Sequence, residues 1–172
     1  MRQGLLTGDW DKLKKDLERM GSLLEKNLAT ATKINAMRLV DGTKDTIRSG
    51  RGMVALQPET IKRKGSSKPL IDYADMLNAI THKLITKLSF FIGIPRTAKR
   101  KKGPNAGEDL VNIGEAHEKG APKANIPARP FIHPTIQRMW KSMVATWKGC
   151  LRDTLRGETT RAHRRSFNSG RA

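Results

Sequence analysis

The chain has 172 residues, and its 34 Lys and Arg against 16 Asp and Glu give a formal net charge of +18. This length suffices for one domain with a hydrophobic core, and so large a positive charge favours anionic partners: nucleic acid, an anionic membrane surface or an acidic protein face. A single cysteine, Cys150, excludes an internal disulfide framework and leaves too few thiolates for a structural zinc site.

A long helix is predicted to begin after Asp9, a suitable N-cap. It carries a stripe of apolar residues at alternating steps of three and four, interrupted by Asn27: Trp10, Leu13, Leu17, Met20, Leu24, Ala31 and Ile34. The stripe is compatible with a coiled coil, but too few uninterrupted heptads follow one another, so packing against the protein's own sheet is favoured. Turn signals place the helix end near Gly42 or Gly50. The residues that precede this helix include no long apolar run, so we expect neither a signal peptide nor a membrane span.

The middle of the chain predicts a loop, a short helix and a hairpin. Residues 51–68 are rich in Gly, Pro, Ser and Lys and indicate an exposed loop, and residues 71–79 indicate a short helix. Residues 80–84 and 87–94 are rich in Ile, Leu, Phe and Thr, as in strands, and an antiparallel hairpin is expected between them. The alternation places Ile80, His82 and Leu84 on one face.

A strongly basic segment follows at residues 96–107, with five positive charges and no negative one. Like charges at this density repel one another, so we expect a mobile loop. Residues 108–118 predict a short helix with Leu110, Val111 and Ile113 turned inward, and Gly120 is expected to end it because glycine tolerates positive φ.

The last predicted helix spans residues 134–156 and ends at Gly157. Two prolines shortly before it predict that residues 126–131 form an extended edge segment. The helix has a wide apolar face: Ile136, Met139, Trp140, Met143, Val144, Trp147, Cys150, Leu151 and Leu155. Two tryptophans and two methionines on that face suit a protein-binding groove, but packing on the sheet is favoured because a small sheet needs a helix to cover it. Cys150 is interpreted as a buried hydrophobic residue.

These elements predict an α+β fold, with a long N-terminal helix and a C-terminal helix packed on a small, mostly antiparallel sheet that carries long basic loops. Residues 1–157 form one domain in this interpretation. Residues 158–172 are polar and rich in Arg, Ser and Gly, and they predict a basic tail that is disordered on its own.

No pattern of catalytic residues is present. The four histidines are scattered, no nucleophile turn or phosphate-binding glycine loop occurs, and we identify no paired acidic cluster of catalytic type beyond Asp72 and Asp75. Glu115, His117 and Glu118 include metal-ligating residue types, but a capping or turn role for His117 is favoured. We therefore expect no catalytic residues, no bound metal and no cofactor.

The most distinctive sequence lies in two short segments. A turn contains His117, Glu118 and Gly120, and it is followed by the run Ile126, Pro127, Ala128, Arg129, Pro130 and Phe131. In this order they resemble the phage virion morphogenesis family, which includes the Mu protein G-like and lambda protein Z-like tail completion proteins. Residues 56–64 and 68–80 are similar to two upstream segments of the family, although Tyr73 and Ala74 replace its usual Thr-Gly pair. The resemblance extends over roughly residues 9–155.

The resemblance implies a structural protein of the virion neck or tail, assembled in the host cytoplasm, that completes or caps the tail tube and helps to join it to the head. It implies a homo-oligomeric ring, a hexamer, whose partners are tail-tube, terminator or connector proteins, with possible contact to genomic DNA. Arg129 is expected either to form a salt bridge with a neighbouring subunit or to bond carbonyl groups within its own fold, and the second role is favoured.

The alternative is a non-enzymatic nucleic-acid-binding protein that contacts phosphates without sequence preference. Basic residues of three segments are the candidates for facing DNA or a partner protein: Lys62, Arg63, Lys64, Arg96, Lys99, Arg100, Lys101, Lys102, Arg161, Arg164 and Arg165. No aromatic residue lies within these runs to stack on bases. A purely solvated loop is an equally good interpretation of each run.

Overall fold

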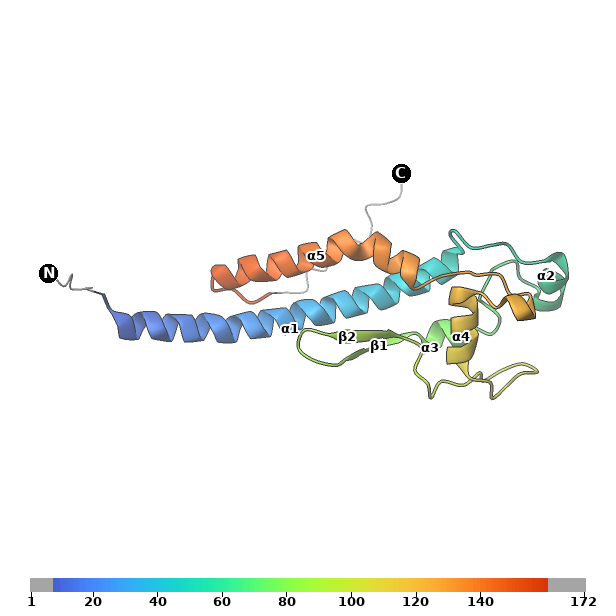
Figure 1. Cartoon of the computed structure of the whole chain (residues 1–172), viewed down its shortest axis with the longest axis horizontal. Helices are drawn as coiled ribbons and strands as arrows, with labels where there is room; N and C mark the ends of the chain where they lie inside the picture. The colour runs from blue at the N-terminus through green and yellow to red at the C-terminus, as the bar shows by residue number, and fades with distance from the viewer. Residues whose placement is uncertain (1–7, 161–172) are drawn as a thin grey trace.

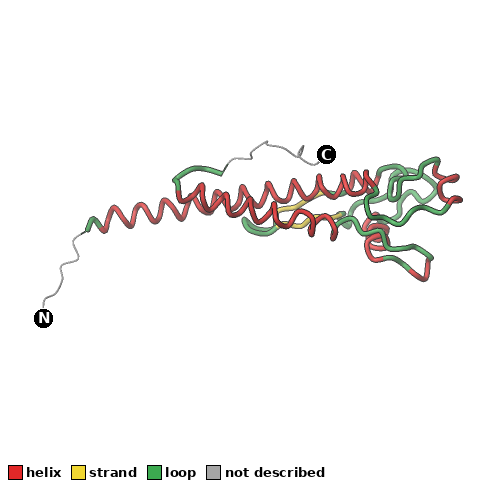
Figure 2. Tube along the Cα trace, turned by 90° about the horizontal axis from the view of Figure 1, so that it is seen from above, coloured by secondary structure: helices red, strands yellow, loops and turns green. Residues whose placement is uncertain are grey.

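The structure, a computed structural model, describes residues 8–160. It is elongated, and helix α1 (Trp10–Ser49) forms its long axis (Figure 1). Helix α5 (His133–Leu155) runs back along the second half of α1, whereas the short helices α2 (Pro58–Lys64), α3 (Asp75–Ala79) and α4 (Leu110–Lys119) gather at the C-terminal end of α1. We call this end the head. In both Figure 1 and Figure 2 the first turns of α1 extend beyond every other described element.

Helix α1 begins and ends with clear caps. The side chain of Asp9 accepts a hydrogen bond from the backbone N–H of Lys12 at 2.9 Å, which satisfies one of the free donors of the first turn. Gly50 follows the helix with φ of 63°, and its N–H bonds to the carbonyls of Thr46 and Ile47. Of the two predicted ends, Gly50 is therefore correct. Gly42 lies inside the helix, where a Cβ atom would come within 2.5 Å of the sulfur of Met139, so glycine permits α5 to approach closely.

The contact between α1 and α5 combines an apolar cluster with buried polar bonds. Leu39 packs against Met139 and Met143, which are at most 6% exposed. The hydroxyls of Thr46 and Thr135 lie 2.7 Å apart, so each of these two buried hydroxyls has a partner.

Asn27, which interrupts the apolar stripe, is 2% exposed. Its amide donates to the hydroxyl of Thr154 and to the carbonyl of Glu158, and its carbonyl accepts from the N–H of Thr160. Asn27 thus fixes the chain where it leaves α5.

The hairpin consists of β1 (Thr81–Leu84) and β2 (Phe90–Gly93), paired antiparallel with His82 opposite Ile92. Two strands and their antiparallel pairing are thus confirmed, but the second strand is shorter than the predicted range 87–94. Phe90 and Ile92 pack against the cluster between α1 and α5. Because side chains alternate along a strand, Phe91 lies on the other face, and it is exposed.

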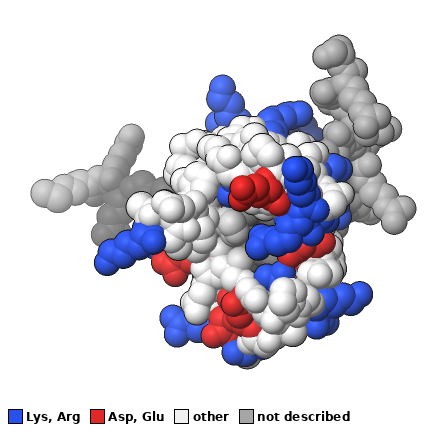
Figure 3. Space-filling view, turned by 90° about the vertical axis from the view of Figure 1, so that its right-hand side faces the viewer, with Lys and Arg blue, Asp and Glu red and all other residues white. Residues whose placement is uncertain are grey.

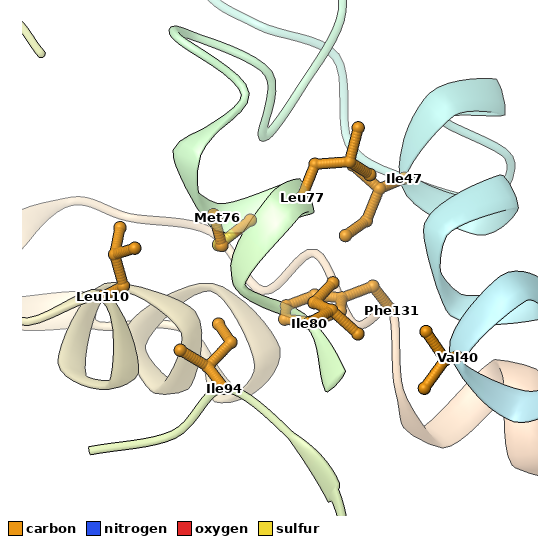
Figure 4. Close-up of a cluster of buried hydrophobic side chains, with 8 residues drawn as sticks. All are labelled: Val40, Ile47, Met76, Leu77, Ile80, Ile94, Leu110 and Phe131. Carbon is orange, nitrogen blue, oxygen red and sulfur yellow. The ribbon is translucent and has the colours of Figure 1, made fainter. Parts of the chain in front are cut away.

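A second cluster forms the core of the head (Figure 4). We call residues 126–131 the proline-containing segment. The cluster joins one residue of this segment to residues from α1, α3, α4 and the flanks of the hairpin: Val40, Ile47, Met76, Leu77, Ile80, Ile94, Leu110 and Phe131. Phe131 is 1% exposed and is the largest of the fully buried side chains. The α+β class predicted from the sequence is confirmed, with two long helices and a small antiparallel sheet.

Several local predictions are wrong. Residues 51–68 were expected to be loop throughout, but Pro58 begins α2, as suits a residue that needs no donor at the first helical position. The short helix expected at residues 71–79 forms only over Asp75–Ala79. Residues 126–131 lie in no strand; their one bridge pairs Ile126 with Ala121.

The predicted burial of the two long helices is only partly correct. In the first half of α1 the apolar stripe was expected to pack on the protein's own sheet, but Trp10, Leu13, Leu17 and Met20 are exposed. In α5, Trp140, Leu151 and Leu155 are exposed as well, and the helix packs chiefly on α1. No helix among residues 8–160 has an apolar stretch long enough to cross a membrane.

Candidate functional site

The turn and the proline-containing segment are joined by one carboxylate. Glu118, in the last turn of α4, accepts backbone hydrogen bonds from Phe131 at 2.7 Å, Ile132 at 3.0 Å and His133 at 2.9 Å. These N–H groups belong to the start of α5, which has no cap from its own side chains. A negative group at a helix N-terminus satisfies free donors and interacts favourably with the helix dipole. Glu118 is therefore the cap of α5.

Arg129 connects three segments of the head. Its backbone N–H donates to the carbonyl of His117 at 2.7 Å. Its guanidinium donates from Nε to the carbonyl of Val54 at 2.8 Å and from Nη2 to that of Ala55 at 3.2 Å. The side chain is 6% exposed. Of the two roles expected for Arg129, the bonding of carbonyls within its own fold is therefore observed.

The distinctive motif consists of the turn at residues 117–120 and the proline-containing segment. Its remaining residues lie close to Glu118 and Arg129. Gly120 has φ of 80°, and a Cβ atom there would lie 3.1 Å from the backbone nitrogen of Ala128, so the turn requires a residue without a side chain. Phe131 enters the core of the head, while Ile126 and Pro127 line a cavity. Pro130 is half-buried between Arg129 and Phe131.

This cavity has a volume of about 400 Å³ and lies where α2, α4 and the proline-containing segment meet. Four arginine and lysine side chains from three parts of the sequence line it: Arg63, Lys64, Arg100 and Arg129. His117 lies beside them. The fold thus brings two predicted basic segments to the distinctive motif, a proximity that the sequence did not predict. We call this hollow the head cavity.

Positive charges crowd the head cavity. Burial lowers the pKa of His117, and the nearby cations Arg129 and Lys64 lower it further. Burial also lowers the pKa of Lys64, with Asp72 acting in the opposite direction and Arg129 in the same direction. The Nδ1 atom of His117 is buried and has no hydrogen-bond partner among the described residues. This site therefore holds cationic groups that neighbouring carboxylates only partly balance.

The basic loop at residues 96–107 is bonded to α3 and to the residues just before this helix. Arg100 forms a salt bridge with Asp72 at 2.5 Å, and its guanidinium lies 5.7 Å from the ring centre of Tyr73. The carboxylate of Asp75 accepts the backbone N–H groups of Lys101 and Lys102 at 2.8 and 3.2 Å. The segment that was expected to form a mobile loop is thus bonded to the rest of the fold through Asp72 and Asp75, the acidic pair noted in the sequence.

The other predicted basic residues are dispersed. Lys62 and Arg96 are exposed, and Lys99 forms an ion pair with Asp109. Figure 3 views the molecule from the head, where Lys and Arg side chains are spread over the face among Asp and Glu. Arg161, Arg164 and Arg165 lie outside the described residues.

Residues 8–160 contain no group of three His, Cys, Asp or Glu side chains placed to hold a metal ion. Comparisons of the chain with protein families, curated proteins and solved structures gave no match. Function is therefore inferred from the residues and their geometry.

Proposed function

We propose that this protein is a structural, non-catalytic subunit of a phage particle. In this proposal it forms a homo-oligomeric ring at the neck or tail of the phage. There it completes or caps the tail tube and helps to join the tube to the phage capsid. The order of the motif residues suggests this family. The observation that carries the proposal is the apolar stripe on the first half of α1, which no other described residue range covers, because contiguous exposed apolar side chains typically mark a contact with another protein.

The stripe has the geometry of a helix-pairing surface. Trp10, Leu13, Leu17 and Met20 follow one another at steps of three, four and three, the spacing of a coiled-coil seam. Their exposed fractions are 56%, 47%, 59% and 38%. No described element lies beside these turns (Figure 2).

Charge favours a second copy of this chain as the occupant. Residues 9–26 contain five acidic and five basic residues, so this segment is neutral, whereas the whole chain carries +18. Two such chains repel one another through most of their surface. The neutral stripe is a place where copies can meet without that repulsion, and opposite charges beside the seam can pair across it.

The test compares two substitutions on the same helix. Leu17→Glu places a charge within the stripe, whereas Met37→Glu places one at an exposed position outside it. We expect the unaltered protein and Met37→Glu to be oligomers by light scattering and rings by negative-stain imaging, and Leu17→Glu to be a monomer with an unchanged circular dichroism spectrum. A monomeric unaltered protein would contradict the proposal.

The alternative function, sequence-independent binding of nucleic acid, is favoured by one observation: basic residues of α2, of the loop at residues 96–107 and of the motif line the head cavity together. Under this alternative a monomer binds DNA with an affinity that falls steeply with salt, because released counterions contribute much of the binding free energy. Fluorescence anisotropy with labelled duplex DNA at several salt concentrations measures this dependence. A ring that binds no DNA would exclude the alternative.

A further inference from the structure

The head cavity contains a charged side chain whose bonding capacity is only partly used. Arg129 is buried, yet among residues 8–160 it forms no ion pair; its two guanidinium bonds go to neutral backbone carbonyls. A guanidinium has five N–H donors. With Nε and one N–H of Nη2 engaged, three N–H groups remain, two on Nη1 and one on Nη2. A guanidinium can use one N–H of each Nη atom to bind both oxygens of a carboxylate.

Lys64 is in a similar position. Its ammonium donates to the carbonyl of Lys68 at 3.2 Å and forms no ion pair within the described part of the chain. Arg100, in contrast, is paired with Asp72. A partly buried cation without a carboxylate is costly. The cavity therefore holds cationic groups that an anion would stabilise.

The rest of the cavity wall is mixed. Its polar part includes Gln57, Thr60, Asp75 and Asn125, together with Asp72, which is paired with Arg100. Its apolar part comes from the loop before α2, from α3 and the residues just before it, from α4 and from the proline-containing segment. It includes Leu56, Leu70, Met76, Leu110, Ile113 and Ile126. A ligand with an anionic end and an apolar stem can therefore meet both the unpaired cations and the apolar part of the wall. A volume of about 400 Å³ suits a small molecule or a few residues of a peptide.

We propose that the head cavity binds a carboxylate on an apolar stem, presented by a polypeptide: either a chain's carboxy terminus or an acidic side chain beside apolar residues. Arg129 holds the two oxygens, Lys64 balances the charge, and the apolar wall contacts the stem. A nucleic-acid phosphate fits less well, because its polar sugar would face the apolar wall. The proposal is independent of ring formation.

The first experiment uses sodium hexanoate as a probe and observes the His117 ring by NMR, with His117→Gln to assign the signal. We expect saturable shifts, with a dissociation constant on the order of 1–10 mM for so small a ligand. Lys64→Met should weaken binding about fivefold or more. Lys62→Met, on the same helix but outside the cavity, should leave it unchanged.

Matched probes decide the chemistry. Hexanamide has the same stem without the charge, and sodium phosphate has the charge without the stem. Equal binding of hexanamide would overturn the role of the cations, and binding of phosphate but not hexanoate would overturn that of the apolar wall. If no probe gives a saturable shift, the cavity is not a ligand site. Arg63→Gln, at an exposed side chain, provides a second variant should Lys64→Met unfold.

Peptides then distinguish the two sources of the carboxylate. Acetyl-Ala-Leu-Leu with a free carboxy terminus is compared with its amide, and with acetyl-Leu-Glu-Leu-amide. Binding of only the first peptide assigns the site to a chain terminus, and binding of only the third assigns it to an internal acidic residue. Binding of hexanoate but of neither charged peptide would contradict a polypeptide ligand.

Discussion

Single side chains of the motif act as connectors between segments that are far apart in the sequence. Glu118 joins α4 to the start of α5 through three backbone N–H groups, and Arg129 joins the same region to the carbonyls of Val54 and Ala55. Both are charged groups bonded to backbone, which are among the stronger hydrogen bonds in proteins. The motif therefore has a clear structural role, whatever partner the head contacts.

Substitution of Glu118 should lower stability measurably. Glu118→Gln keeps the size of the side chain but removes its charge and one of the two acceptor oxygens, so at least one N–H at the start of α5 loses its partner. We expect the free energy of unfolding to fall by about 1–3 kcal/mol, measured by urea denaturation. Glu115→Gln is the control: Glu115 pairs only with Lys119 on the exposed side of the same helix, and no measurable change is expected. Equal effects of the two substitutions would contradict the capping role.

The pKa of His117 predicts a dependence of stability on pH. Burial and the cations Arg129 and Lys64 lower this pKa in the folded state. When the pH falls below about 6.5, the ordinary pKa of histidine, the unfolded chain binds a proton more readily than the folded chain does. Stability contributed by neutral His117 is therefore present at higher pH and is lost as the pH falls through this region.

Urea denaturation between about pH 7.5 and pH 5.5 measures this effect, because Asp and Glu have ordinary pKa values near 4 and contribute less there. The cavity also contains Arg63, Arg100, Asp72 and Asp75, and all four are present in both the unaltered protein and His117→Gln. The unaltered protein should lose stability over this range, and His117→Gln should lose less. The same slope in both would show that another group is responsible.

Among the elements, α1 has two different halves. Its second half packs against α5 and the hairpin, and Gly42 permits the close approach at Met139. Its first half continues the same apolar spacing, and no element between residues 8 and 160 covers it. Hydrophobic periodicity predicted the length of the helix and its stripe, but periodicity specifies a face and not what lies against that face.

Met139→Ala should test the contact between the two helices. Met139 is 6% exposed and packs on Leu39, so its truncation removes apolar contacts and leaves a cavity. We expect a loss of about 2–4 kcal/mol in the free energy of unfolding, measured by urea denaturation. Trp140→Ala, one position along and 55% exposed, is the matched control and should cost less than half as much. A larger effect at Trp140 would mean that its ring is covered in solution.

The sequence predicted elements better than the contacts between them. Asp9, Gly50, Gly120 and Gly157 signal helix ends through local chemistry, and the structure places helix ends beside each of them. The head cavity could not be predicted in this way, because it depends on long-range contacts such as that of Arg100 with Asp72. Charge density alone predicted a mobile loop at residues 96–107, and it could not predict the contacts with Asp72 and Asp75, because repulsion within a segment says nothing of carboxylates that the fold brings to it.

At the scale of the whole molecule, a formal net charge of +18 acts on both stability and association. The described part of the chain contains five salt bridges, and at least one partner in each has a side chain exposed by more than 40%. Exposed pairs contribute little to stability. Repulsion among the unbalanced cations should therefore dominate the electrostatics of the folded protein and oppose contact between copies.

Salt should accordingly stabilise this protein and promote its self-association. Raising the ionic strength from about 0.01 M to 0.1 M shortens the screening length from about 30 Å to 10 Å, which weakens long-range repulsion more than attraction between charges in contact. We expect the melting temperature and the fraction of oligomer to rise together over this range, measured by calorimetry and light scattering. Leu17→Glu should retain the rise in melting temperature but lose the rise in oligomer, because it disrupts the stripe and leaves the rest of the charge intact. A melting temperature that falls with salt would mean that the salt bridges outweigh the repulsion.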